Sequence, residues 1–495
     1  MDLKRVSLRT TRWLRARRWA VGAVALAICV PVSSAQVVVG EGVPTGPGAA
    51  VVGTSSSFSG GKWGDAQADA LSKDDYGKNQ ATKDPGSLYT VEKAIGARSL
   101  WAKKDKLGRP VTGQGVSVAV LDSGVSAVAG LSGAGKVTYG PDLSIEANGV
   151  LTADQDSFGH GTFMAGIVAG RGTTNPSSDL PSAPANVQLG VAPDAKLLAL
   201  KLATTDGSAD VSQMIAALDW VTQHPVLPDG TRVRVINLSY GTNSEQAYLA
   251  DPLAAAAENA WRHGIVVVTS AGNDGSLNGR LTDPATDPYV IAVGATDSKE
   301  RIDGWTHDHT TVASYSDVVS TGRHVDLVAP GTSLVSVRDT GSFVDVNNPS
   351  GLVSGDVGGQ LFRGSGTSQA AAVVSGSVAL LLQAYPTLTP DQVKYALTST
   401  ADPITNSSPN ADGAGTLDLN GAFGAAGHLV GTDSTAGIMR AAAVQTFPSS
   451  TGQGSIDAAR GGSVVVDSGG NDLSGEVDVQ DAACAHAAWW QASTS

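Results

Sequence analysis

The chain has 495 residues, of which 41% are hydrophobic, 16% are charged, 60 are glycine and only two are cysteine. This composition excludes a small disulfide scaffold, a coiled coil and a disordered polyelectrolyte, while the length allows two or three domains. The net charge of −13 argues against a nucleic acid partner, because an acidic surface repels a polyanion.

The first 35 residues have the pattern of a secretory signal peptide. Seven basic residues within positions 4–18 precede an apolar run over residues 19–32, and Ala35 suits signal peptidase cleavage directly after it. A retained membrane anchor is the alternative, but the apolar run is short for a bilayer span. Loss of residues 1–35, which hold seven basic residues and one acidic residue, would change the net charge from −13 to −19 and leave Cys484 as the single cysteine. No disulfide could then form within the mature chain.

Three further regions follow the signal. Residues 36–86 are rich in Gly, Ser, Asp and Lys without a sustained helical or strand period, so we interpret them as a flexible segment or a short pro-region. Residues 87–427 alternate apolar strands with helical runs, which predicts one large α/β domain. Residues 428–495 are rich in Ala, Gly and Asp and contain no apolar run of membrane-spanning length, so we expect a C-terminal tail.

The domain over residues 87–427 contains short, nearly continuous apolar runs that are typical of strands buried on both faces of a parallel sheet. These runs are residues 116–121, 196–202, 233–239, 265–270, 289–295 and 325–330. Helices are predicted over residues 208–223, 252–263, 368–384 and 389–397, and Thr389 and Pro390 mark the start of the last one. The fold class is therefore a doubly wound three-layer α/β sandwich with a mainly parallel central sheet. Ligands bind such sheets beyond the carboxyl ends of the strands.

Four polar residues stand at the ends of these predicted elements. Asp122 and Asn273 follow strands, His160 lies in GHGTFMAG before a helix rich in small residues, and Ser368 begins the helix over residues 368–384. Three of them also have an ordinary structural interpretation, with Asp122 and Asn273 as turn residues and Ser368 as a helix N-cap. Together, however, they supply what acyl transfer needs: a nucleophile, a base, a carboxylate that orients the base and an oxyanion donor.

The segments LDSG, GHGTFMAG, SAGN and GTSQAA resemble the signature segments of the subtilases, the subtilisin-like serine proteases, and the order Asp, His, Ser is that of subtilisin. The resemblance covers roughly residues 88–427, and the tail resembles those of secreted actinobacterial members. It implies that His160 takes the proton of Ser368 during attack on the scissile carbonyl, and that Asp122 orients His160. It also implies that Asn273 and the backbone N–H of Ser368 bind the oxyanion.

For the substrate, the resemblance implies an extended peptide bound as a strand between two edges of the chain. The residues expected to bind it are Asp206, Gly207 and Ser208 on one edge, Ser239, Tyr240 and Gly241 on the other, and Ser270, Ala271 and Gly272 in the primary specificity pocket. The family often has a cis proline near this pocket, at the position matched by Asp283-Pro284.

The sequence departs from the family pattern at several positions. Gln369, Ala372 and Val373 stand where Met, Pro and His are usual, so the packing behind the nucleophile must differ. Residues 36–86 look too short and too rich in glycine for a folded inhibitory prosegment. The usual calcium loop is not matched before Gly190; we therefore assign no metal site, leave structural calcium open, and expect the chemistry to need no cofactor.

These observations predict a serine endopeptidase that is secreted or associated with the cell envelope. We expect polypeptide substrates, no nucleic acid partner, no membrane attachment after signal removal, and a monomer. The main alternative is a catalytically inactive subtilase fold that acts as a binding protein. A membrane-anchored processing protease should end in an apolar span, and an α/β-hydrolase would need a Gly-x-Ser-x-Gly elbow and the order Ser, acid, His.

Overall fold

The computed structural model describes residues 80–461, except for residues 148–154, 173–176, 278, 299–309, 321, 354–355 and 357–358, together with four two-residue strands outside this range. The predicted signal peptide, most of residues 36–79 and Cys484 lie outside the described residues. The chain divides into one unit of residues 52–465 and a second unit of residues 1–51 and 466–495. The candidate site lies in the first unit.

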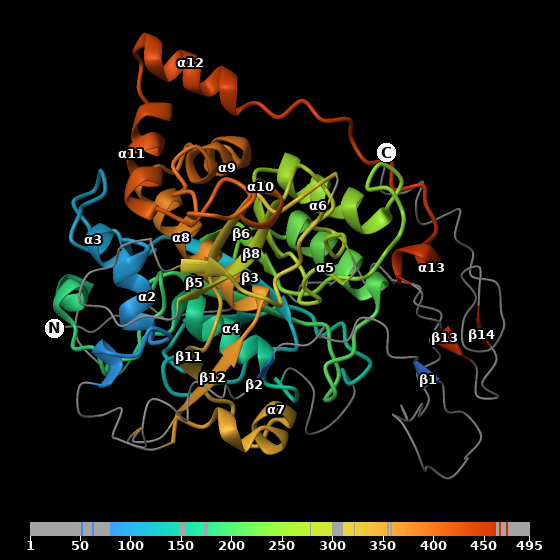
Figure 1. Ribbon diagram of the computed structural model, residues 1–495. Coiled ribbons are helices and arrows are strands. Elements are labelled where there is room, and N and C mark those ends of the chain that lie inside the picture. Colours follow the sequence, from blue (N-terminus) through green and yellow to red (C-terminus); the bar gives the residue numbers. More distant parts are fainter. Residues whose placement is uncertain are drawn as a thin grey trace, which may run out of the picture. The chain divides into compact units, whose positions relative to one another are not determined.

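The first unit is built on a mainly parallel sheet of eight strands, in which β9 is the antiparallel member (Figure 1). The strand order is β10-β8-β7-β6-β3-β5-β4, with β9 beside β8. The strands are β3 (Val116–Asp122), β4 (Val137–Tyr139), β5 (Lys196–Lys201), β6 (Arg232–Leu238), β7 (Val266–Ser270), β8 (Ile291–Ser298), β9 (Thr310–Val312) and β10 (Leu327–Pro330). All six predicted strands are present with ends shifted by at most three residues, so the predicted fold class is confirmed.

Helices cover this sheet, and four of them were predicted. The α-helices are α2 (Leu88–Ala94), α3 (Ala97–Trp101), α4 (His160–Ala169), α5 (Val211–Gln223), α6 (Pro252–Arg262), α7 (Phe343–Asn347), α8 (Thr367–Ala384), α9 (Pro390–Thr398), α10 (Pro409–Asp412), α11 (Leu419–Leu429), α12 (Ser434–Ala443) and α13 (Ile456–Ala459). The 3₁₀ helices are η2 (Gln80–Thr82), η3 (Ser177–Ser182) and η5 (Pro349–Gly351). The helix predicted from residue 208 begins at Val211 because Asp210 and Gln213 form a capping box there.

A second, antiparallel sheet leads into the nucleophile helix. Its strands are β11 (Leu334–Val337), β12 (Leu361–Ser365) and β2 (Lys62–Trp63), with β12 in the middle. After β12 the chain passes Gly366 and enters α8. A separate small sheet contains β1 (Val51–Val52), β13 (Val465–Val466) and β14 (Asp472–Leu473).

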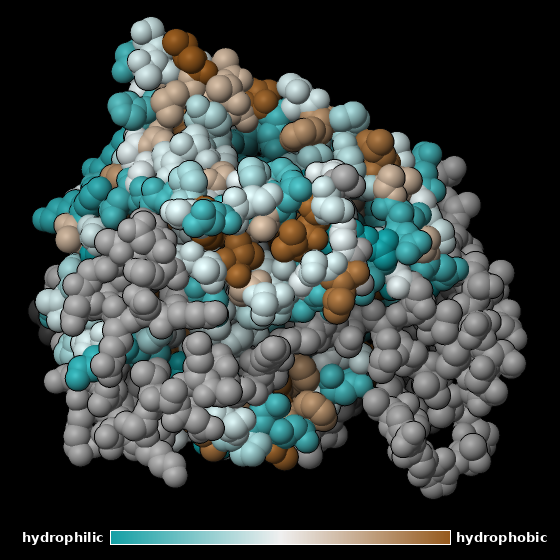
Figure 2. Space-filling model, in the orientation of Figure 1, coloured by the Kyte–Doolittle hydropathy of each residue, from teal (hydrophilic) through white to brown (hydrophobic). Residues whose placement is uncertain are grey.

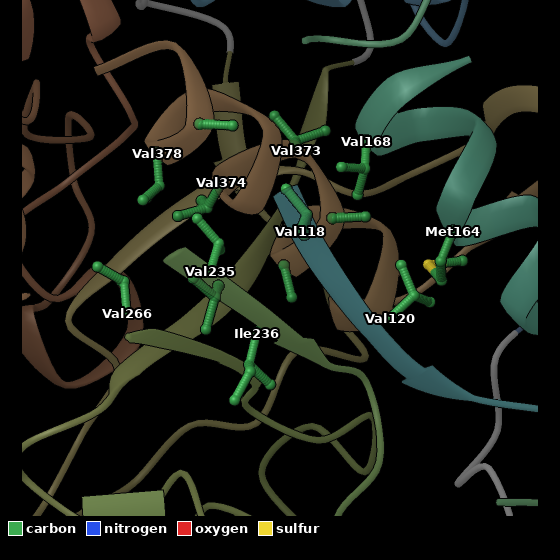
Figure 3. Close-up of a cluster of buried hydrophobic side chains, with 14 of the residues drawn as sticks. Val118, Val120, Met164, Val168, Val235, Ile236, Val266, Val373, Val374 and Val378 are labelled. Atoms are coloured by element: carbon green, nitrogen blue, oxygen red, sulfur yellow. The ribbon is translucent and has the colours of Figure 1, made fainter. Parts of the chain in front are cut away.

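The core forms where α8 crosses the parallel sheet. All 18 residues of α8 are buried, and the helix contacts β3, β6, β7, β8, β10 and α4. Figure 3 shows valines of α8 beside Val118 of β3, Val235 of β6 and Val168 of α4. Each such side chain contributes about 1.5–3 kcal/mol when it is fully buried. Within the described part of the chain, α8 is the one helix long and apolar enough to cross a membrane, but its complete burial identifies it as a core helix.

Ordered structure continues on both sides of the predicted domain boundaries, which stay predictions. Before residue 87, Ala81 and Asp84 are already buried. After residue 427, α11 continues to Leu429, and α12 (upper left in Figure 2) and α13 follow within the predicted tail.

Candidate active site

Asp122 and His160 are held together by the end of β3 and the start of α4. Asp122 is the last residue of β3 and is fully buried, while His160 is the first residue of α4 and is 4% exposed. The Nδ1 atom of His160 lies 2.8 Å and 3.0 Å from the two carboxylate oxygens of Asp122. Because an ionised carboxylate can only accept, Nδ1 carries the proton and Nε2 is left as the basic nitrogen.

Gly161 makes this close approach possible. A Cβ atom at Gly161 would lie 2.1 Å from the carbonyl oxygen of Gly124 and 3.0 Å from Cβ of Asp122. Its backbone N–H donates to Oγ of Ser123 at 2.9 Å, which binds the first turn of α4 to the end of β3. A glycine is therefore required at this crossing, and a larger residue would push His160 away from Asp122.

A second buried carboxylate shapes the turn before His160. Asp156 accepts hydrogen bonds from Oγ of Ser123 at 2.7 Å and from the backbone N–H groups of Gly159 at 2.6 Å and Thr162 at 2.7 Å. Burial raises the pKa of Asp156, although these hydrogen bonds oppose the shift. Asp156 was not among the predicted site residues. Its hydrogen bonds fix the loop on both sides of His160.

Ser368 is the second residue of α8, so the reading of Ser368 as the helix N-cap is wrong. Gly366 occupies that position in an extended conformation and makes no side-chain cap. Ser368 is 4% exposed, and its hydroxyl donates to the carbonyl oxygen of Ser239 at 3.3 Å. The N-terminus of a helix favours negative charge, which suits both a serine nucleophile and an oxyanion.

Asn273 lies beside the first turn of α8 and is oriented by Thr367. Its Oδ1 atom accepts from the backbone N–H of Thr367 at 2.8 Å and from the Thr367 hydroxyl at 3.1 Å. Since a backbone N–H can bond only the oxygen end of the amide, the Nδ2 end of Asn273 is directed away from Thr367 and can donate elsewhere. Thr367 is fully buried and was not predicted, although it adjoins Ser368 in GTSQAA.

The structure also brings the two predicted substrate edges together. The hydroxyl of Tyr240 donates across to the carbonyl oxygen of Gly207 at 3.1 Å. Burial raises the pKa of Tyr240 well above its usual value, and the nearby carboxylates of Asp122, Asp156 and Asp206 add to the shift. This hydroxyl therefore keeps its proton. Asp206 bonds within its own edge, where Oδ1 accepts from the backbone N–H of Ser208 at 3.1 Å. Ser239, at the start of the other edge, lies directly beside Ser368.

The predicted pocket segment, residues 270–272, is held by contacts with Thr282 and Asp317. The backbone N–H of Thr282 donates to the carbonyl oxygen of Ala271 at 2.9 Å. A Cβ atom at Gly272 would lie 2.0 Å from Oδ2 of Asp317, and Oδ1 of Asp317 accepts from the backbone N–H of Asp274 at 2.6 Å. Burial raises the pKa of Asp317 to about 7. The predicted cis bond at Asp283-Pro284 is confirmed.

The departures from the family pattern lie inside the core. Gln369 is 1% exposed, and Ala372 and Val373 are fully buried on α8. Across the described ranges, no group of three or more His, Cys, Asp or Glu side chains is arranged to hold a metal ion. The expectations on metal and cofactors stay predictions.

Comparison with known proteins identifies the family of this chain. Residues 113–426 match the sequence profile of the Subtilase family. Serine protease AprX of Bacillus subtilis is 33% identical over 63% of this chain and 66% of its own length, so the chain spans slightly less than two thirds of that relative. Subtilisin DY of Bacillus licheniformis is 31% identical over 60% of this chain and 88% of its own length.

A solved structure supports the fold. Fervidolysin from Fervidobacterium pennivorans, described as a keratinolytic enzyme related to subtilisin, matches with a TM-score of 0.52 and 23% identity. The match covers 74% of this chain and 51% of fervidolysin. From the profile and the sequence relatives, this chain belongs to the subtilase family of serine proteases.

Proposed function

We propose that this subtilase is a secreted endopeptidase that cleaves peptide bonds with Asp122, His160 and Ser368 and stabilises the oxyanion with Asn273. The observation that carries the proposal is the bond between Nδ1 of His160 and the buried carboxylate of Asp122 at 2.8 Å. This bond leaves Nε2 of His160 as a base. An orienting carboxylate holds the imidazole in the tautomer that can accept the serine proton, and it stabilises the imidazolium that forms.

In the proposed reaction, Oγ of Ser368 attacks the scissile carbonyl carbon while its proton passes to Nε2 of His160. The carboxylate of Asp122 stabilises the imidazolium that results. The carbonyl oxygen becomes an oxyanion, which accepts hydrogen bonds from Nδ2 of Asn273 and from the backbone N–H of Ser368 at the positive end of α8. His160 then protonates the leaving amine, and the C–N bond breaks to give an acyl-enzyme. Water attacks this ester with the same base, which releases the acid and restores Ser368.

Substrate binding would use main-chain groups of the two edges. An extended polypeptide between residues 206–208 and residues 239–241 would exchange backbone hydrogen bonds with both, which accounts for sequence-tolerant affinity. The hydroxyl of Ser368 donates to the carbonyl oxygen of Ser239, a main-chain acceptor on one of these edges. We expect a peptide N–H that takes this acceptor to release the hydroxyl for His160.

The remaining features of the proposal follow from the sequence. Removal of residues 1–35 would deliver an acidic monomer to the extracellular space or the cell envelope, without membrane attachment. The substrates would be polypeptides and not nucleic acids. Catalysis would need no cofactor, since the chain itself supplies the nucleophile, the base and the oxyanion donors.

Fluorophosphonate labelling of the secreted protein tests the proposal. We expect one label per chain at Ser368, by intact mass and peptide mapping, together with casein hydrolysis. Ser368→Ala should lose both. Ser377→Ala is the matched control, because Ser377 lies on the same helix, is also buried, and bonds only the carbonyl oxygen of Val373 at 2.9 Å. If folded wild type takes no label, the serine is not activated and the inactive binding protein becomes the better reading.

A further inference from the structure

Residues 445–461, which follow α12, form a segment that we call the C-terminal strap. Figure 1 shows this segment in red, running from α12 across to α13. The composition of this region predicts a C-terminal tail, and the strap is the part of it that is bound along its length. The side-chain amide of Gln445 donates to Asp391 at 3.0 Å. Further along the strap, the backbone N–H groups of Thr451 and Gly454 donate to the carbonyl oxygens of Leu249 and Ala250.

The strap ends against the elements that carry the substrate edges. Its short helix α13 contacts both α5 and α6. Ala459 is fully buried, and its carbonyl oxygen accepts from the hydroxyl of Thr242 at 2.5 Å. A Cβ atom at Gly461 would lie 2.6–2.9 Å from the backbone of Asn243, so the main chains are in direct contact there. The end of the strap therefore lies on the loop that continues the edge over residues 239–241.

An ion pair joins the strap to a residue shortly after the other edge. Nε of Arg460 lies 2.7 Å from Oδ2 of Asp210, which is two residues beyond Ser208, and the two side chains are only 14% and 17% exposed. Burial alone would raise the pKa of Asp210, but the hydrogen bond and charge of Arg460, together with bonds from Ser212, hold it below its usual value. The strap thus contacts residues that closely follow both edges.

Along the chain, these contacts follow the two proposed substrate edges, at Thr242 and at Asp210. The edge over residues 239–241 begins at Ser239, beside Ser368, and reaches Thr242 after three further residues. At the extended rise of about 3.3 Å per residue, Thr242 lies up to about 10 Å along the chain from Ser239. A substrate strand that runs along this edge would meet the strap after about three residues.

We propose that the C-terminal strap closes the groove between the two edges at Thr242 and limits the substrate to about three bound residues on the acyl side of the scissile bond. This inference rests on the proposed peptidase function and adds a determinant of substrate length to it. A fourth acyl-side residue must turn away from the edges, so it gains no backbone hydrogen bonds. Arg460 is then a specificity-determining residue that acts through the position of the strap and touches no reacting atom.

The test compares kcat/KM for fluorogenic peptides with two, three, four or five residues on the acyl side and the same residue at the cleavage site. For wild type, kcat/KM should rise up to three residues and then level off. In Arg460→Glu the new carboxylate is repelled by Asp210, and in Arg460→Ala the ion pair is only lost. In both variants kcat/KM should keep rising for peptides with four and five acyl-side residues. We expect about a tenfold gain, the effect of one or two additional backbone hydrogen bonds, and an unchanged value for the shortest peptide.

Arg440→Glu is the matched control, since Arg440 lies in the same C-terminal region but bonds the carbonyls of Leu429 and Gly431. It should keep the plateau at three residues. Fluorophosphonate titration of each variant gives the fraction of active enzyme and separates a folding defect from an effect on length. The role of the strap would be overturned, with labelling intact, by either of two results. One is a kcat/KM of wild type that keeps rising beyond three acyl-side residues, and the other is an unchanged plateau in both Arg460 variants. Absence of labelling and hydrolysis in wild type would overturn the peptidase function and the strap inference with it.

Discussion

The backbone N–H of Thr367 donates to Oδ1 of Asn273 at 2.8 Å, and this bond joins two segments that are 94 residues apart in sequence. One segment carries the proposed nucleophile and the other the proposed oxyanion donor. The Thr367 hydroxyl adds a second link, because it accepts from the backbone N–H of Gly272 at 3.2 Å. An amide held in this way needs little reorganisation when charge develops on the substrate oxygen.

Thr367→Val should therefore lower kcat more than it changes KM. The substitution keeps the shape and the backbone N–H, but it removes the hydroxyl that bonds Gly272 and Asn273. We expect kcat to fall about tenfold, since one buried hydrogen bond contributes about 1 kcal/mol and its loss leaves a donor unpaired. Steady-state kinetics on one peptide checks this. Thr398→Val on α9 is the control and should leave kcat unchanged. An equal fall of kcat in both variants would contradict the positioning role of Thr367.

The contact between α4 and β3 predicts opposite effects for two glycines in helices. At Gly161 an added Cβ would meet the carbonyl oxygen of Gly124 at 2.1 Å, whereas at Gly437 nothing lies within 4 Å. Gly161→Ala should cost about 1–3 kcal/mol of unfolding free energy and lower kcat, because α4 must move and take His160 with it. Gly437→Ala on α12 should stabilise the chain by about 1 kcal/mol, since alanine favours the helix. Urea unfolding of both variants measures this, and a stable, fully active Gly161→Ala would refute the close-contact argument.

A carboxyl near the His160 loop should make stability depend on pH. Burial, and then the charge of Asp156, raises the pKa of Asp339 to about 7, against a usual value of 3.8. Between pH 4 and pH 7 the folded state thus holds a proton that the unfolded state has lost, so this group makes stability fall as pH rises. Asp339→Asn removes that dependence. We expect a gain of about 1–2 kcal/mol at pH 8 relative to wild type, less than the full shift because the side chain is partly exposed.

Urea unfolding at pH 5 and pH 8 tests this prediction for Asp339→Asn. The gain from Asp339→Asn should be absent or reversed at pH 5, where the wild-type carboxyl is already protonated. Asp345→Asn is a useful contrast, because hydrogen bonds and charge from Arg338 outweigh its burial and hold the pKa of Asp345 below its usual value. That variant should be destabilised at both pH values. A pH-independent gain for Asp339→Asn would contradict the raised pKa.

The sequence predicted the buried centre of this fold well, for a physical reason. Strands such as β3 and β7 are covered on both faces, so they appear as continuous apolar runs, and α9 carries its capping signal in Thr389 and Gln392. The short strands β4 and β9 were missed. They have three residues each and are only partly buried, so they lack that signal.

The contacts that position the site were harder to predict, because they join residues far apart in sequence. The four candidate site residues could be found since each lies in a short motif. The link of Asn273 to Thr367 and that of Arg460 to Asp210 span 94 and 250 residues. The strap is bound largely through main-chain groups, which every residue has, so its side-chain composition does not predict these contacts.

A buried ion pair supplies the last prediction. Nη2 of Arg363 on β12 lies 2.5 Å from Oδ2 of Asp84, with side-chain exposures of 8% and 6%, and its Nη1 donates to the carbonyl oxygen of Ser333 at 2.7 Å. Arg363→Met should cost about 3–5 kcal/mol, because it leaves the Asp84 charge buried without its partner. Arg280→Met is the control and should cost less than about 1 kcal/mol, since its partner Glu245 is 85% exposed. Urea unfolding compares the two. Because β12 leads through Gly366 into α8, Arg363→Met should also lower the fraction of chains that take the fluorophosphonate label. Similar losses of unfolding free energy in the two arginine variants would show that the buried pair does not anchor this strand.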